Sequence, residues 1–412
     1  MDKIKSIRGM HDIHGSEFLH QRQIIELFEF VATNFNFKPI ATPIMEFNEI
    51  FSRTLGLSSD VVMKEMYTLS DRNNEKLTLR PEGTAGIARA IISNGLTQDI
   101  PLKFYYYGPM FRYERPQKGR LRQFTQVGVE VYANSNIEKD FEVISFAEKF
   151  LKDLNIRDNL ILKINNLGNW EDRKTYTKEL KKYYSEFKND LSEDSIIRLE
   201  KNPLRILDSK NLEDIEVNKN APKINEYLSD NNKSIFIRLK AMLEDFNISF
   251  EEDPFLVRGL DYYSNTIFEF ALKTDSKFAI LAGGTYDNLI SELGGPKLSG
   301  TGWAAGVERL TKLVDFVTKS SKQILIIPLE EKYIRNAYEV RQTLLNTKLS
   351  SEVAITKNLK KSLKYGNKIG ADYAIIIGDE ENKNKIYTIK NLNTGNQNKV
   401  KKSLILEFFK NA

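Results

Sequence analysis

Residues 111–124 read FRYERPQKGRLRQF and hold four arginines and one lysine against one glutamate. Two apolar runs flank this basic loop, KFYYYGPMF at 103–111 and FTQVGVEVY at 124–132. Both runs are rich in aromatic or β-branched residues, which is typical of strands. The stretch therefore predicts two sheet strands joined by a basic connection, and it raises the question of what that connection meets.

The second run alternates between an apolar and a polar face. Val127, Val129 and Val131 share one parity with Thr125 and face the expected core. The other parity carries Phe124, Gln126, Gly128, Glu130 and Tyr132. If the two runs pair, Arg112 and Glu114 lie on that polar face too. Because charges in mid-strand are costly against a core, this face is either open to water or a polar binding cleft. We favour a cleft, since Gly128 leaves room for a ligand.

Composition limits the class of protein. The 412 residues suffice for two or three domains, and 41% hydrophobic with 28% charged residues is ordinary for a globular protein. No apolar run approaches the length of a membrane span, and the start MDKIKSIRGMHDI lacks the apolar region of a signal peptide. The chain has no cysteine, which excludes disulfides, thiolate zinc sites and a cysteine nucleophile. We expect a cytoplasmic protein without a membrane segment.

Charge is unevenly distributed along the chain. Residues 321–412 hold 17 Lys and Arg against 9 Asp and Glu, a balance of +8, whereas the rest is slightly acidic at −3. A basic terminal segment favours a polyanionic partner such as nucleic acid. A lysine-rich solvated surface is the alternative.

The three histidines, His11, His14 and His20, all lie near the start of the chain. HDIHG at 11–15 could supply two metal ligands, but no third ligand of suitable spacing follows. We interpret the segment as a turn and expect no metal held by the protein itself.

The first 245 residues are predicted to mix helices with short strands. Apolar residues at helical spacing predict a helix over 16–34. The extended stretch 37–47 contains Pro39 and Pro43, which favours an edge or interface segment. The chain then predicts a hairpin around DRNNEK, helices over 84–95 and 136–154, and a polar helical module over about 168–245.

From residue 323 the pattern changes to alternating strands and helices. The order is QILIIPL, a helix over 332–346, SEVAIT, a helix over 359–369, ADYAIIIG, then KIYTIK and a last helix. This alternation predicts a separate small α/β domain with a mainly parallel sheet.

Two further segments are candidates for a site. In LVRGLDYY (256–263), Arg258 is either a structural ion-pair partner or a ligand-binding group, and Gly259 suits a close approach by a ligand. In GTGWAAGVERL (300–310), Gly300, Gly302 and Gly306 allow close packing or form a floor for a flat ring. Arg309, at the following helix start, could face a phosphate.

Together these segments resemble the class II aminoacyl-tRNA synthetases and, within them, the histidyl-tRNA synthetases. RGMHDI (8–13) resembles the N-terminal signature, IATPIMEF (40–47) motif 1, FRYERPQKGRLRQF motif 2 and GVERL (306–310) motif 3. RPEGT (80–84), LVRGLDYY and AGGTYDNL (282–289) resemble the histidine-specific blocks. The resemblance runs nearly end to end.

The resemblance implies an α+β catalytic domain over 1–320 with an antiparallel six-stranded sheet and an inserted helical module at about 168–245. It implies a C-terminal α/β anticodon-binding domain over 321–412 and a homodimer. The implied activity is ATP-dependent ligation of L-histidine to tRNA(His) through a histidyl-adenylate, with release of pyrophosphate and AMP. Mg²⁺ is expected to arrive with ATP.

The matching positions imply roles around ATP. Arg112 would bridge the histidine carboxylate and the α-phosphate, and Arg258 would approach from the other side, so both would be catalytic. The remaining ATP contacts would be Glu114 at the adenine amino group, Phe124 on the ring, and Arg120 and Arg309 at the β- and γ-phosphates.

For histidine, the resemblance implies one group of side chains at the α-amino group and another at the imidazole. The expected residues are Glu82, Gly83 and Thr84 with Gln126 nearby, Glu130 and Tyr262 at the ring nitrogens, Tyr263 along the wall, and Arg112 and Arg258. Arg115, Gln117 and Lys118 at the loop tip would meet the acceptor end of tRNA. An analogue lacking one ring nitrogen leaves a buried polar group unpaired, so discrimination can be large.

One block departs from the family pattern, because Thr285 stands where the family commonly has arginine. That puts the usual role of the arginine in doubt. Two alternatives remain: a synthetase-like regulatory subunit of histidine biosynthesis, and a binding or scaffold protein with an inactive synthetase domain. The segment 323–412 and the intact basic loop argue against the first. Arg112, Glu114, Arg258 and Arg309 argue against the second.

Overall fold

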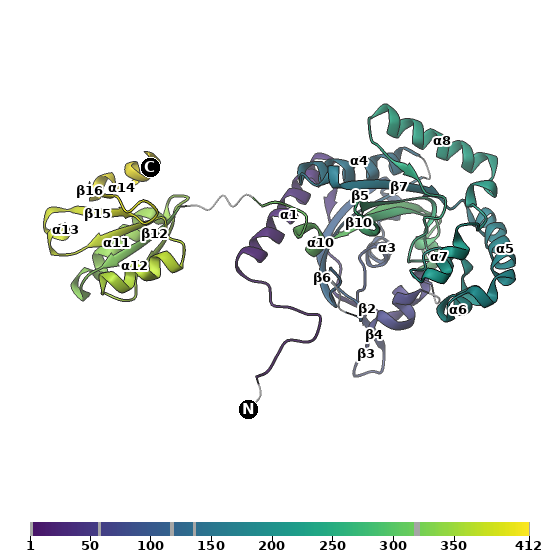
Figure 1. The fold of residues 1–412 in the computed structure, drawn as a ribbon, viewed down its shortest axis with the longest axis horizontal. Helices are drawn as coiled ribbons and strands as arrows, with labels where there is room; N and C mark the ends of the chain where they lie inside the picture. The colour runs from purple at the N-terminus through teal and green to yellow at the C-terminus, as the bar shows by residue number, and fades with distance from the viewer. Residues whose placement is uncertain (1–2, 57–58, 116–118, 135–136, 317–321, 412) are drawn as a thin grey trace. The chain divides into compact units, whose positions relative to one another are not determined.

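The computed structural model describes residues 3–56, 59–115, 119–134, 137–316 and 322–411 (Figure 1). The chain divides into two compact units, Met1–Asp315 and Phe316–Ala412. Within the described ranges, no helix has both the length and the apolar character that crossing a membrane requires.

A large sheet organises the first unit. Its strands are β1 Lys38–Pro39, β5 Leu102–Phe111, β6 Gln123–Ala133, β11 Ser299–Gly306, β10 Asp275–Tyr286, β9 Ser264–Leu272, β7 Leu160–Asn166 and β8 Glu251–Glu252, in that spatial order. The six strands from β5 to β7 pair antiparallel, as expected. The expected total of six is wrong, because β1 and β8 add parallel pairs at the two edges. Strands of two residues are too short to show an alternation in the sequence.

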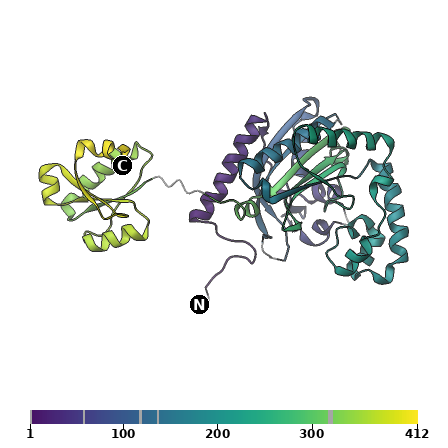
Figure 2. The ribbon, with the colours of Figure 1, turned by 45° about the horizontal axis from the view of Figure 1, so that its top comes forward.

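Helices cover the valine face of this sheet. Val127, Val129 and Val131 are buried on the side where α1 (Gly15–Asn34) and α4 (Ile137–Asp153) pack. An aromatic cluster joins the layers, with Phe28 of α1 against Tyr105, Phe146, Phe150 and Trp303. Figure 2 shows the purple helix α1 running alongside the sheet. The opposite face of β6 is thereby left to its polar side chains.

A smaller antiparallel sheet leads the chain into the site. It consists of β2 Met45–Phe47, β4 Lys76–Leu79 and β3 Tyr67–Ser70, and β3 with β4 forms the predicted hairpin. Helix α2 (Asn48–Thr54) and a π-helical turn (Val61–Glu65) lie between β2 and β3. After β4, the RPEGT segment opens helix α3 (Thr84–Ser93).

Residues 168–245 are helical, as the polar composition predicted. The helices are α5 Trp170–Glu186, α6 Glu193–Lys201, α7 Leu212–Asn218 and α8 Asp230–Asp245, with a 3-10 turn at Pro203–Ile206. Helix α5 begins after Asn169, whose side chain accepts from the N–H groups of Glu171 and Asp172. Its buried stripe, Tyr176, Leu180 and Tyr184, repeats every four residues and packs into the module core.

The second unit is a five-stranded sheet with helices on it. Its strands, in spatial order, are β13 Ser350–Val353, β12 Gln323–Pro328, β14 Tyr373–Ile377, β15 Ile386–Asn391 and β16 Gln397–Lys401; its helices are α11 Ile334–Leu345, α12 Leu359–Lys368, α13 Asp379–Asn384 and α14 Ile405–Asn411. The first three strands are parallel, as predicted. The sheet as a whole is mixed, because β15 and β16 pair antiparallel. The polar run QNKVK lacks the apolar alternation that would have marked β16.

Candidate functional site

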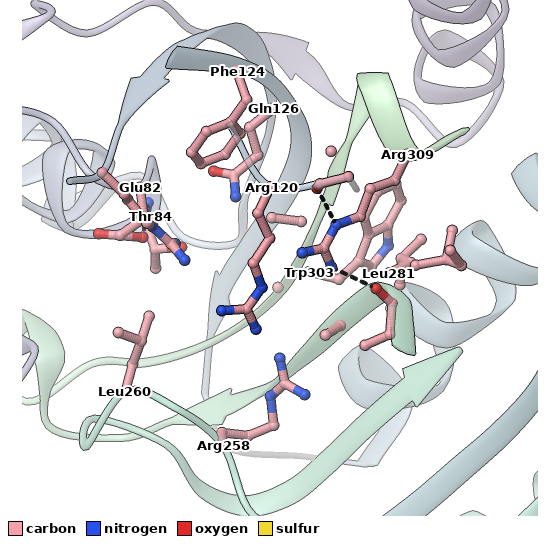
Figure 3. Close-up of a pocket in the computed structure, with 18 of the residues that line it drawn as sticks. Glu82, Thr84, Arg120, Phe124, Gln126, Arg258, Leu260, Leu281, Trp303 and Arg309 are labelled. Atoms are coloured by element: carbon pink, nitrogen blue, oxygen red, sulfur yellow. Dashed lines mark hydrogen bonds between the residues drawn. The ribbon is translucent and has the colours of Figure 1, made fainter. Parts of the chain in front are cut away.

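One pocket gathers the polar face of β6, the start of α3, the loop before β9, and strands β10 and β11 (Figure 3). The space between its lining residues, including the part that is open to solvent, is about 1000 Å³. The sequence-predicted residues that it brings together are Glu82, Thr84, Arg112, Glu114, Arg120, Phe124, Gln126, Arg258, Tyr262, Tyr263 and Arg309. Gly83, Arg115 and Glu130 do not line it. Gln117 and Lys118 lie outside the described residues.

Glu114 joins two arginines of the basic loop. Its carboxylate oxygens lie 3.1 Å from Arg120 Nη1 and 3.9 Å from Arg112 Nη1. Arg112 also donates through Nε to the Pro81 carbonyl at 2.9 Å, and its guanidinium lies 5.6 Å from the centre of the Phe124 ring. Arg112 is thus fixed to the RPEGT segment and to the strand that returns from the loop.

Arg258 lies across the pocket from Arg120, and the two guanidinium groups point toward each other (Figure 3). Arg258 Nη1 donates to Glu269 Oε2 at 2.9 Å. Burial raises the pKa of Glu269, and the charge of Arg258 opposes that rise. Arg258 Nε is buried and has no hydrogen-bond partner in the part of the chain that the structure describes. Because an unpaired buried donor is costly, this arginine suits an acceptor supplied by a ligand.

Arg309, on helix α10 (Val307–Thr311), ties the end of the basic loop to the sheet. Its Nε donates to the Gly119 carbonyl at 3.0 Å and its Nη1 to the Ala279 carbonyl at 2.8 Å. Its guanidinium lies 4.8 Å from the centre of the Phe278 ring. Burial, and then the charge of Arg120, lowers the pKa of Arg309. Because a guanidinium carries about five N–H donors, these two bonds leave others for an anion.

The RPEGT segment caps helix α3 with a buried carboxylate. Glu82 accepts from the N–H of Thr84 at 2.6 Å and from the N–H of Ala85 at 2.8 Å. Burial raises the pKa of Glu82, and these backbone hydrogen bonds oppose the rise. Glycine is required at 83, because a Cβ there would lie 2.3 Å from the Tyr106 ring.

The sequence-based reason for a cleft at Gly128 is wrong. A Cβ at Gly128 would lie 2.5 Å from the Tyr106 ring, so a tyrosine of the neighbouring strand fills that space. The Tyr106 hydroxyl donates to Gln126 Oε1 at 3.4 Å. This face of β6 does line a polar pocket, but only through Phe124 and Gln126 and not through Gly128.

Glu130 lies beneath the pocket and is 1% exposed. Its carboxylate accepts from the Thr84 hydroxyl at 2.6 Å and from the Tyr286 hydroxyl. Burial raises the pKa of Glu130 to about 8, although the hydrogen bonds from Thr84 and Tyr286 oppose this. Glycine at 302 makes room for the carboxylate, since a Cβ there would lie 1.9 Å from Glu130 Oε2.

Tyr286 is a pocket residue that sequence reasoning missed. Its ring packs edge-on against Tyr262, with centroids 5.5 Å apart. The period-two alternation within AGGTYDNL is the signal that could have found it. Its neighbour Thr285 serves the opposite face, where the hydroxyl donates to Asp140 at 2.9 Å and lies 3.0 Å from Thr301 Oγ1. The departure at Thr285 therefore leaves the pocket lining intact.

The two interpretations of GTGWAAGVERL each account for part of it. Gly300 allows close packing, because a Cβ there would lie 2.1 Å from the Tyr286 ring. Gly302, Ala304 and Gly306 line the pocket.

Comparisons with known proteins identify the family. A family model for histidyl-tRNA synthetase matches residues 9–310, and one for an anticodon binding domain matches 323–412. A histidine–tRNA ligase of Rhodospirillum rubrum is 44% identical over 412 residues, covering 99% of each chain, and one of Gluconobacter oxydans is 41% identical over 401 residues, covering 97% of each. The crystal structure of apo S. aureus histidyl-tRNA synthetase matches with a TM-score of 0.81 and 30% identity, covering 99% of this chain and 100% of that one.

These matches confirm the resemblance that the motifs indicated. They also confirm the fold class, a class II catalytic fold followed by an anticodon-binding α/β unit. The chain belongs to the histidyl-tRNA synthetase family.

Proposed function

We propose that the chain is an ATP-dependent ligase that joins histidine to tRNA(His) through a histidyl-adenylate. The observation that carries the proposal is the composition of the pocket. Four arginines, Arg112, Arg120, Arg258 and Arg309, line it together, and the lining residue Tyr286 donates to the buried Glu130. Guanidinium groups suit a triphosphate and a carboxylate. A buried carboxylate and phenol suit a small ring with two nitrogens.

In the first step, a carboxylate oxygen of histidine forms a bond to the α-phosphorus of ATP. The bond from that phosphorus to the oxygen bridging to the β-phosphorus breaks, and pyrophosphate leaves. No proton has to move, so positioning and charge stabilisation govern the rate. Arg112 and Arg258 stabilise the reacting α-phosphate from two sides, and Arg120 and Arg309 bind the leaving pyrophosphate.

In the second step, a hydroxyl of the terminal adenosine of tRNA attacks the histidyl carbonyl carbon. AMP leaves, and the hydroxyl proton is released. Phe124 stacks on the adenine of ATP and Glu114 binds its amino group, while Arg115, Gln117 and Lys118 of the loop tip meet the tRNA acceptor end.

Recognition of histidine uses the other end of the pocket. Glu82 and Thr84, with Gln126, bind the α-amino group. A neutral imidazole has one N–H donor and one acceptor nitrogen. Glu130, acting with Tyr286, and Tyr262 from the facing loop supply the two partners, and Tyr263 lines the wall.

Mg²⁺ enters with ATP, held by phosphate oxygens. Within the described ranges, no three His, Asp or Glu side chains are grouped so as to hold a metal ion.

The second unit supplies the anticodon contact, and the protein acts as a homodimer. The match of 323–412 to an anticodon binding domain, together with its basic balance, supports the first assignment. Exposed apolar side chains in the motif 1 segment, Ile44, Met45 and Phe47, support the second.

ATP–pyrophosphate exchange with each amino acid in turn tests the proposal. Histidine-dependent exchange, followed by histidine transfer to tRNA(His), is the expected result. Exchange without histidine, or a preference for another amino acid, would overturn it. Histidine binding with neither exchange nor charging would instead favour a regulatory subunit.

A further inference from the structure

Three side chains of the inserted module bond to the loop that carries Arg258, Tyr262 and Tyr263. They are Arg173 on α5, Asn202 after α6 and Arg205 in the 3-10 turn Pro203–Ile206. Their partners in the loop lie between 53 and 90 residues further along the chain. The module is therefore connected to the site by specific hydrogen bonds as well as by packing.

Arg205 holds the start of this loop. It is 7% exposed, and its Nη1 donates to the Arg258 carbonyl at 3.0 Å. Asp60 at 3.3 Å and Asp208 at 3.5 Å bind the same guanidinium. Gly259 faces it, since a Cβ there would lie 3.5 Å from Arg205 Nη1. A buried guanidinium that is held by two carboxylates fixes the backbone that it bonds.

Arg173 and Asn202 hold the end of the loop. Arg173 Nη1 donates to the Tyr263 carbonyl at 2.6 Å and lies 3.5 Å from the Asp261 carbonyl. Asn202 Nδ2 donates to Asp261 Oδ1 at 3.0 Å. The Asp261 carboxylate in turn packs on Gly56, where a Cβ would lie 2.0 Å from Oδ2. The backbone on either side of the two tyrosines is thus anchored.

We propose that the inserted module is a clamp for this loop, with Arg205 as a positioning residue for Arg258 and Arg173 with Asn202 as positioning residues for the two tyrosines. The inference rests on the roles proposed above for the loop. Misplacing a catalytic group by about 1 Å can cost about 100-fold in rate. An anchor on the Arg258 backbone therefore acts on the rate of adenylation, whereas an anchor next to Tyr263 acts on histidine binding.

Kinetics of ATP–pyrophosphate exchange by the full chain separate the two ends of the clamp. For Arg205→Ala we expect kcat to fall about 100-fold, with the KM for histidine changed by less than about threefold. For Arg173→Ala we expect the KM for histidine to rise about tenfold, with a smaller change in kcat.

Arg157→Ala is the matched control. Arg157 is also 7% exposed and also bonds a carboxylate and backbone carbonyls, but it does so away from the pocket. Its loss should lower the thermal midpoint and leave both kinetic constants within about threefold of wild type.

Arg205→Lys keeps a positive charge near Asp60 and Asp208, so it decides the matter if Arg205→Ala does not fold. It lacks the forked geometry, and kcat should fall about tenfold. In single-turnover adenylation, Arg205→Lys should cause no further loss in an Arg258→Ala background. A wild-type kcat in Arg205→Lys, or a loss that adds fully to that of Arg258→Ala, overturns the clamp. Failure of the proposed function gives a different result from failure of the clamp, because the wild-type chain itself would then show no histidine-dependent exchange.

Discussion

The two ends of the pocket are built differently. At the end that we propose binds histidine (the histidine end), both carboxyl oxygens of Glu130 already accept hydrogen bonds, and the side chain is 1% exposed. At the end that we propose binds the phosphates of ATP (the phosphate end), the Arg112 and Arg120 side chains are 23% and 40% exposed and share one carboxylate. Arg258 Nε there has no partner among the residues that the structure describes. The first end is a completed polar network, whereas the second is an excess of cationic donors. We infer that the fold itself fixes the side chains proposed to select histidine. The arginines proposed to bind ATP, by contrast, reach their full set of partners only when the anionic ligand is bound.

The largest expected effect is at the phosphate end. Arg258→Ala should lower ATP–pyrophosphate exchange by about 100- to 1000-fold, because it removes the charge that we propose stabilises the reacting phosphate. Histidine binding, measured by calorimetry, should survive in part. Arg238→Ala, which changes an exposed arginine of α8, serves as the control. Near-normal exchange in Arg258→Ala would show that adenylation does not depend on Arg258.

The pH dependence of stability tests the histidine end. Folded Glu130 keeps its proton to a pH of about 8, because burial raises its pKa, whereas an unfolded glutamate loses its proton near 4.5. The stability that this group contributes is therefore complete below pH 4.5 and is lost as the pH rises toward 8. Glu130→Gln has no proton to lose at this position. As the pH rises from 4.5 to 8, its free energy of unfolding should therefore increase relative to that of wild type. Denaturant titrations at pH 5 and pH 8 measure the difference.

Glu49→Gln, on the exposed side of α2, controls for the loss of one acidic side chain. If Glu130→Gln and wild type change with pH in parallel, Glu130 does not titrate as its burial implies. Glu130→Gln should also raise the KM for histidine by about 100-fold, because it replaces the carboxyl group that we propose as a partner of the imidazole.

Tyr286→Phe tests whether Tyr286 belongs to the histidine end of the pocket. It removes the hydroxyl that donates to Glu130 and keeps the ring that packs on Tyr262. The KM for histidine should rise about tenfold, with the KM for ATP unchanged. Tyr184→Phe removes a comparable hydroxyl bond inside the module, to Asn218, and should leave the KM for histidine unchanged. A rise in the KM for ATP alone would place Tyr286 at the wrong end.

The smallest expected effect on activity is at Thr285, directly behind Tyr286. Thr285→Val removes a donor from the buried Asp140 and should lower the free energy of unfolding by about 1–3 kcal/mol. The KM for histidine should not change, because this side chain serves the face away from the pocket. Thr285→Ser, which retains the hydroxyl, should recover most of the stability in denaturant titrations. A change in the KM for histidine would contradict this, because it would show that a residue on the far face of the sheet also affects histidine binding.

Long periodic patterns made much of the fold predictable. The alternation of β6 and the helical spacing of α1 were found in the sequence because each spans many residues. The edge position of β1 followed from Pro39 in the extended stretch 37–47. The strand β8 was not found, because two residues carry no period. Strand β16 was missed because its polar run has no apolar alternation.

The candidate site shows the same limit at the level of side chains. Arginines and carboxylates within motifs could be named from the sequence. The filling of the space at Gly128 could not, because it depends on the register that places Tyr106 opposite that glycine. The contact between Arg205 and Arg258 has no sequence signal either, because it joins two segments 53 residues apart without a shared period.

Because both tryptophans lie in the first unit, tryptophan fluorescence can distinguish the unfolding of the two units. Trp303 is 1% exposed within the aromatic cluster, and Trp170 is 65% exposed at the start of α5. The second unit has none. Intrinsic tryptophan emission therefore follows unfolding of the first unit, while circular dichroism follows both. Melting curves recorded with the two probes give separate stabilities for the two units in the intact chain.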